Sequence, residues 1–228
     1  MRYPTLGRGG ALLLALTITI LAPPGRGQIV QAHPLTPQSK AEAAKVAKKV
    51  ERAKSRAAKE AKHELEAVRD FTKRLDRYER LHNNYLARLG GQTAVTAQGL
   101  FEAIVKDRAK AEQGDVFISE IRPLLKRLIA EQLAGADGAA ARKALVEGNP
   151  GAGPEPDTAP VPVLAKVNLA YPEGATRSTM PPSILLTLPT LPECLHYRFV
   201  GRDLLLVDSV AQNIVDVLTN AAPPLGGK

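Results

Sequence analysis

The sequence predicts a mainly α-helical protein: an antiparallel helical bundle with a long N-terminal helix, then a Pro-rich linker and a small C-terminal antiparallel β meander. Three observations lead to this prediction. Apolar residues make up 44% of the 228 residues but aromatic residues only 4%, which favours an aliphatic, Ala-rich helical core. Residues 40–89 contain neither Gly nor Pro. Five prolines then crowd into residues 149–162, which predicts a linker.

The N-terminus predicts export. Two arginines among the first eight residues precede an uncharged apolar run of 12 residues, 11–22, which is too short to span a bilayer. The small residues Val30 and Ala32 fit a signal peptidase site, and 25–27 offers a second one. We expect 1–32 to be a signal peptide cleaved after Ala32 and the mature protein to lie in the periplasm or outside the cell. An uncleaved anchor is the open alternative.

The positive charge belongs to the helical part of the chain. The whole protein carries a net charge of +8. Residues 33–149 hold 23 Lys/Arg against 16 Asp/Glu, whereas residues 150–228 hold 5 against 7. This asymmetry suits an anionic partner without naming one. The single cysteine, Cys194, excludes an intramolecular disulfide.

A helical region is expected over 33–148, beginning with a long helix over 40–89 that Gly90 and Gly91 end. From Val68 onward the apolar positions alternate by three and four residues, which is a heptad seam. The seam consists of Val68, Phe71, Leu75, Tyr78, His82, Tyr85 and Leu89. It is a candidate interface, either with a second copy of the chain or with helices of the same chain; in the second case it would be the core of the bundle.

Three shorter helices should follow the long one. Apolar periodicity predicts a second helix over 97–113. A third should begin at Ser119 as its N-cap and end at Gly135, and a fourth should span 138–147. The most economical fold packs the second and third helices against the seam.

Residues 40–62, the basic arm, consist almost entirely of Ala, Lys, Arg and Glu. Attraction to an anionic envelope surface contributes about 1 kcal/mol for each nearby Lys or Arg. The arm has no aromatic residue to stack on bases, so nucleic acid is not an expected partner. A solvated helix without a partner is the alternative. The candidate binding residues are Lys45, Lys48, Lys49, Arg52, Lys54, Arg56, Lys59 and Lys62.

A small module is expected over 163–222. Apolar residues alternate over 163–171 as in a strand, and the Pro-punctuated stretch 181–192 suits one helical turn. Gly201 and Arg202 predict a two-residue hairpin turn. The meander should comprise three strands, over 195–200, 203–207 and 213–218.

Parts of the sequence resemble an uncharacterised exported bacterial protein family with no known activity. Four stretches carry the resemblance: Gly114–Phe117, Leu188–Pro192, Tyr197–Leu204 and Ile214–Asp216. It covers residues 68–222 in patches and leaves out the basic arm. The family commonly has Ala-Asn-Leu-Ile where this chain has Ala-Gln-Asn-Ile at 211–214. The resemblance implies export and a helical-then-β layout, and it carries over no functional residue.

Candidate metal and catalytic pairs fail on geometry or on missing partners. Two Glu-x-x-His pairs end at His63 and His82, 19 residues apart on one helix, so about 28 Å separates them. Cys194 and His196 lack the further ligands of a zinc site and a third group to orient a catalytic base. His33 has no second ligand nearby. We therefore expect no metal, no cofactor and no enzymatic activity.

These observations favour a non-enzymatic exported cell-envelope protein that acts by binding or self-association. The alternative is a basic adaptor that attaches to anionic envelope surfaces through residues 40–62. A metal-binding or enzymatic protein is the remote alternative.

Overall fold

The computed structural model describes residues 37–90, 96–147, 163–172 and 180–224. The chain divides into two compact units, 1–49 and 50–228, and the described part of the first unit is the N-terminal part of one helix, 37–49. No helix in the described ranges combines the length and the apolar composition that crossing a bilayer requires. The elements are α1 (Pro37–Gly90), α2 (Ala97–Asp107), α3 (Arg122–Ala134), α4 (Gly138–Glu147), α5 (Pro182–Leu185), β1 (Leu195–Val200), β2 (Asp203–Asp208) and β3 (Ile214–Leu218).

The long helix is confirmed. α1 spans Pro37–Gly90, slightly more than the predicted 40–89, because Pro is well tolerated in the first turn of a helix. Residues 44–63 are exposed on every side, whereas from Ala67 onward one side is buried. α1 is therefore covered by the rest of the chain along its C-terminal half, between Ala67 and Gly90.

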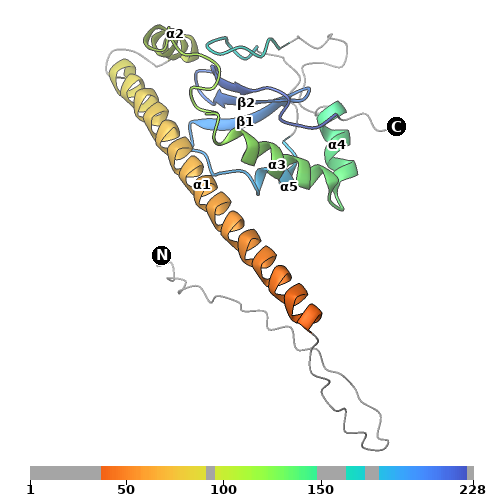
Figure 1. The fold of residues 1–228 in the computed structure, drawn as a ribbon. Coiled ribbons are helices and arrows are strands. Elements are labelled where there is room, and N and C mark those ends of the chain that lie inside the picture. The colour runs from red at the N-terminus through yellow and green to blue at the C-terminus, as the bar shows by residue number, and fades with distance from the viewer. Residues whose placement is uncertain (1–36, 91–95, 148–162, 173–179, 225–228) are drawn as a thin grey trace, which may run out of the picture. The chain divides into compact units, whose positions relative to one another are not determined.

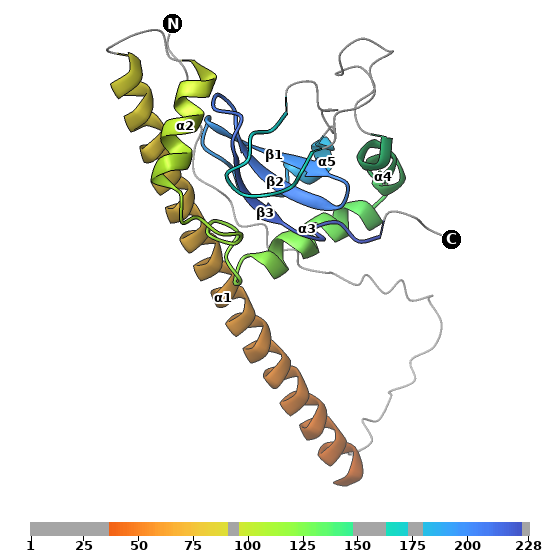
Figure 2. The ribbon, with the colours of Figure 1, turned by 90° about the horizontal axis from the view of Figure 1, so that it is seen from above.

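The β meander is also confirmed. The three strands form one antiparallel sheet in the order β1-β2-β3 (Figure 2). Gly201 has φ +58° at the first position of the β1–β2 turn, the conformation that a two-residue hairpin of this kind needs from glycine. The register between β2 and β3 shifts between Leu206 and Val207, a β-bulge. Beyond it, Ile214 pairs with Val207, and β3 begins there rather than at Asn213.

The sheet is covered on both faces, so its strands are apolar on both sides. Leu204 and Leu206 face the main core, which α1, α3 and α5 also line (Figure 1). Leu205 and Val207 face a second cluster with Tyr171. The segment around Tyr171 is not the expected strand over 163–171. It makes a single bridge, between Ala170 and Asn213, because Asn168 turns the chain at φ +63°.

The helical region and the C-terminal module share one hydrophobic core. The rings of Phe71 on α1 and Phe117 stack at 5.9 Å between centroids, and Phe117 stacks on Tyr197 of β1 at 6.5 Å. The core cluster runs from Ala67 to Ala222. The predicted linker, 149–162, lies outside the described residues, and the segments on either side of it pack as one unit.

The predicted antiparallel bundle stays a prediction, because the seam contacts more than helices. Phe71 of α1 meets Phe117 of the loop after α2, and Tyr78 meets Asp208 at the end of β2, while α2 lies beside the C-terminal half of α1 (Figure 2). The sheet thus supplies part of the cover, because strands that are apolar on both faces must be covered on both. α2 ends at Asp107 rather than 113, and Ser119 does not cap α3: Ile121 stands at the N-cap, and the helix begins at Arg122. α4 spans the predicted residues.

Candidate functional site

All eight candidate residues of the basic arm are exposed: Lys45, Lys48, Lys49, Arg52, Lys54, Arg56, Lys59 and Lys62. One ion pair touches them among the described residues, between Lys62 Nζ and Glu66 at 4.0 Å. At that length and exposure it contributes little. The arm therefore presents its charges to solvent, and residues 40–62 carry nine Lys/Arg against three Glu.

Within each of the two compact units, the charges of the arm gather on one side of the helix. An α-helix advances about 100° per residue, so residues three or four apart lie on the same side. In the first unit this spacing groups Lys45, Lys48 and Lys49. In the second it groups Arg52, Arg56 and Lys59, with Lys62 at the edge. Lys54 projects from the opposite side, among alanines. We call the seven residues of these two groups, which do not include Lys54, the basic stripe.

The heptad seam lies inside the chain. Phe71, Leu75, Tyr78 and His82 are at most 4% exposed and belong to the protein's own core. The other three seam residues, Val68, Tyr85 and Leu89, are partly buried and pack against that core. Of the two arrangements that the sequence leaves open, the structure shows the intramolecular one. The four most buried of these residues are therefore covered by the chain itself.

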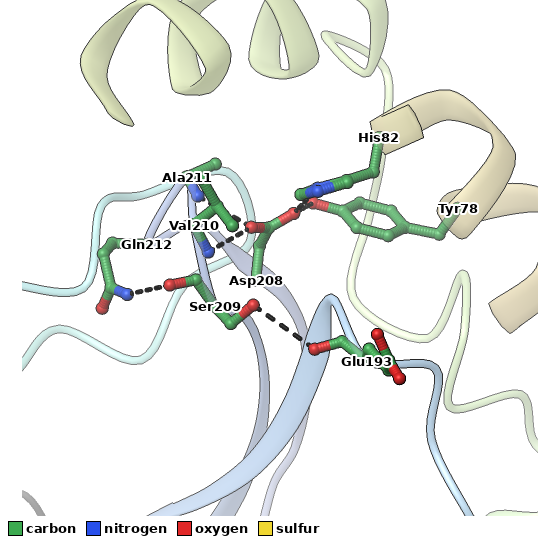
Figure 3. A network of polar contacts seen from close by, with 8 residues as sticks. All are labelled: Tyr78, His82, Glu193, Asp208, Ser209, Val210, Ala211 and Gln212. Atoms are coloured by element: carbon green, nitrogen blue, oxygen red, sulfur yellow. Dashed lines mark hydrogen bonds and ion pairs between the residues drawn. The ribbon is translucent and has the colours of Figure 1, made fainter. Parts of the chain in front are cut away.

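A buried carboxylate at the end of the sheet forms hydrogen bonds with two residues of the seam (Figure 3). Asp208 ends β2 and is fully buried. Its Oδ2 accepts the Tyr78 hydroxyl at 2.9 Å and faces His82 Nδ1 at 2.5 Å. Its Oδ1 accepts the backbone N–H groups of Val210 at 2.9 Å and Ala211 at 2.7 Å. Tyr78 and His82 reach one oxygen because residues four apart lie one above the other on a helix.

The environment keeps this carboxylate ionised. Burial by itself would raise the pKa of Asp208, but the hydrogen bonds from His82 and Ala211 and the His82 charge lower it below its ordinary value. Burial and the nearby Asp208 charge raise the pKa of Tyr78, which therefore stays a neutral donor. Every group described here as contacting the carboxylate donates a hydrogen bond to it. The arrangement is suited to holding α1 on the sheet rather than to abstracting a proton.

A second buried carboxylate organises the loop after α2. Asp216 in β3 accepts the backbone N–H of Gly114 at 2.8 Å on one oxygen. Its other oxygen accepts those of Val116 and Phe117, each at 2.7 Å. Gly114 has φ +101°, a conformation that favours glycine. Asp216 thereby positions the Phe117 ring between α1 and β1.

Among the described residues, the motifs considered for metal binding or catalysis are not assembled into sites; His33 lies outside these residues. The described residues contain no group of three or more His, Cys, Asp or Glu placed to hold a metal ion. Burial and the charges of Asp208 and Glu79 raise the pKa of Cys194 to about 11, so the thiol is not a thiolate at neutral pH. Nε2 of His196 faces Arg198 Nε at 2.5 Å rather than Cys194. His63 is exposed, and its counterpart His82 is fastened to Asp208.

The chain matches no protein-family model, no curated protein and no solved structure. Its function is therefore inferred from its own residues. Of the two surfaces predicted from the sequence, the seam is occupied by the core and the basic arm is exposed.

Proposed function

We propose that this chain is an exported, non-enzymatic adaptor that attaches to the anionic phospholipid surface of the cell envelope through its basic arm, residues 40–62. The observation that carries the proposal is the exposure of all eight basic residues, seven of them on the basic stripe. The fold between Ala67 and Ala222 is the body that the arm would carry to that surface. Export rests on the predicted signal peptide, 1–32.

Charge favours an anionic surface over a second copy of the chain. The arm carries a net charge of +6, so two arms would repel each other. The large apolar residues that could offset this repulsion lie further along α1, and the core occupies them. On the arm itself the exposed aliphatic residues larger than alanine are Val46 and Val50.

The spread of the charges suits an extended surface rather than a compact ligand. Within the second unit alone, from Arg52 to Lys62, the helix rises about 15 Å at about 1.5 Å per residue. Each stripe residue that reaches the headgroups would contribute about 1 kcal/mol at low salt. Alanine and valine on the opposite side offer little to insert among lipid chains, so attachment would be electrostatic and would weaken steeply with salt.

Co-sedimentation with vesicles tests the proposal. The mature chain is mixed with vesicles of phosphatidylglycerol and phosphatidylcholine, or of phosphatidylcholine alone, at about 0.1 M and about 1 M salt, where screening lengths are about 10 and 3 Å. Binding is expected for the phosphatidylglycerol vesicles at the lower salt concentration. Equal binding to neutral vesicles, or binding that survives high salt, would contradict the proposal.

A matched pair of variants locates the surface. The triple variant Arg52→Gln, Arg56→Gln and Lys59→Gln removes three charges from the stripe. The control removes three exposed charges elsewhere, with Arg69→Gln, Lys106→Gln and Lys110→Gln. All six residues are exposed, so both variants should fold. The stripe variant should lose roughly 3 kcal/mol of binding, about a hundredfold, and the control much less.

A further inference from the structure

A cavity of about 570 Å³ lies where α1, α2 and the loop after α2 meet. Figure 2 shows α2 beside the C-terminal half of α1. Four arginines line the cavity: Arg74, Arg77 and Arg80 of α1, and Arg108, which caps α2. The three arginines on α1 are three residues apart, so they project from adjacent parts of the helix surface. The cavity is within the size range of small-molecule sites.

The arginines of this cavity are not neutralised by ion pairs. Within the described ranges none of the four forms a salt bridge with a carboxylate. Asp107 and Asp115 also line the cavity, which leaves it two positive charges in excess. Asp115 accepts the backbone N–H of Glu112 at 3.1 Å, and Arg74 donates to the backbone oxygen of Asp115.

Arg108 is the most enclosed of the four. It is half-buried, it donates to the carbonyl oxygen of Val215 at 3.1 Å, and its guanidinium lies 5.2 Å from the centre of the Tyr78 ring. These partners are neutral. Burial lowers the pKa of Arg108, and the charges of Asp115 and Asp216 offset this only in part. An enclosed cation is costly unless an opposite charge compensates it. The cavity therefore has a fixed guanidinium that an anion would stabilise.

We propose that this cavity binds the phosphate monoester group of a small molecule or lipid. A phosphate monoester carries about two negative charges at neutral pH, which matches the excess of the cavity. Guanidinium groups bind phosphate oxygens through two parallel N–H donors, and Arg77 and Arg80 are exposed and have no hydrogen-bond partner among the described residues. Asp107 and Asp115 would accept hydrogen bonds from hydroxyl groups of the rest of the ligand. The site is separate from the basic arm.

Calorimetric titration of the mature full-length chain tests the site. The probes are glycerol 3-phosphate and, for a lipid source, vesicles of phosphatidic acid in phosphatidylcholine, both titrated into the stripe triple variant so that the contribution of the arm is reduced. Saturable binding of glycerol 3-phosphate would identify a free phosphate ester. Binding of phosphatidic acid without a response to glycerol 3-phosphate would identify the lipid headgroup.

Two single variants distinguish the site from general charge. Arg77→Gln removes an arginine of the cavity, and Arg69→Gln removes an exposed arginine of α1 outside it. Arg77→Gln should weaken the bound probe about tenfold, and Arg69→Gln less than about twofold. Arg108→Lys, which keeps the charge but loses the planar pair of donors, should also weaken it. The absence of saturable binding by either probe, or equal weakening by Arg77→Gln and Arg69→Gln, would overturn the proposal.

Discussion

Tyr78→Phe removes one donor from the buried Asp208 carboxylate and leaves the aromatic packing in place. The hydroxyl lies 2.9 Å from Oδ2, and both residues are at most 4% exposed. A hydrogen bond to a charged group contributes about 1.5–3 kcal/mol, so the free energy of unfolding should fall by about 2 kcal/mol. For a unit of this length that corresponds to a decrease in Tm of about 4–8 °C. Urea and thermal unfolding of the two proteins measure it.

The same variant should change the response to acid. The pKa of Asp208 is lower in the folded protein than in the unfolded chain, so the stability it contributes is present above about pH 4. That stability is lost as the pH falls through the folded pKa. With one donor fewer, the folded pKa of Asp208 rises toward its unfolded value, so Asp208 contributes less stability above about pH 4 and the variant should lose less stability on acidification than the wild type.

Tyr85→Phe is the matched control for this prediction. Tyr85 is partly buried on the same helix, and the described residues show no hydrogen bond to its hydroxyl. Its removal should change the free energy of unfolding by less than about 0.5 kcal/mol. If Tyr78→Phe is no more destabilising than Tyr85→Phe, the Asp208 network does not hold α1 to the sheet.

Three further predictions concern the core. Asp216→Ala leaves three loop N–H groups without an acceptor and should lower the free energy of unfolding in urea by about 3–5 kcal/mol. Asp216→Asn keeps one acceptor oxygen, so its stability should fall between that of Asp216→Ala and that of the wild type. An equal loss of stability for both variants would argue against the role of Asp216 as the acceptor for this loop. Because the pKa of Cys194 is raised to about 11, the unfolded chain loses its thiol proton at a lower pH than the folded chain, so stability should decline as the pH rises above about 9. Cys194→Ala should reduce that decline. An unchanged dependence of stability on pH in this variant would contradict the prediction. A chain cut at a protease site engineered into 149–162 should still run as one particle in gel filtration, because one core spans both pieces; separation of the fragments would show two independent domains.

The elements of the fold follow closely from local sequence patterns. The run of strong helix formers predicts α1, and Gly201 predicts the hairpin turn. What covers the seam does not follow from such patterns, because it depends on contacts between distant residues. Phe71 meets Phe117, and Tyr78 meets Asp208, 130 residues further along the chain. Heptad spacing indicates that a helix face is buried but not whether helices or a sheet cover it.

The two buried aspartates were missed by sequence reasoning, although a signal for them exists. Asp208 ends an apolar strand, and Asp216 interrupts another, so each is a charge where only apolar residues are expected. A carboxylate in such a strand indicates a buried hydrogen-bond network, but the partners cannot be named in advance. The same holds for Arg77 and Arg80. In the sequence they are ordinary charges of a solvated helix, and only the position of Arg108 brings them to one cavity.

Fractionation of cells that express the protein tests its attachment to the envelope. We predict that the chain is found outside the cytoplasm, attached to the envelope, and that a wash with about 1 M salt releases it, because that salt shortens the screening length to about 3 Å. The stripe variant with Arg52→Gln, Arg56→Gln and Lys59→Gln should be exported equally well but recovered in the soluble fraction without the wash. Recovery of the wild-type protein in the cytoplasm, or attachment of the stripe variant as tight as that of the wild type, would contradict the account.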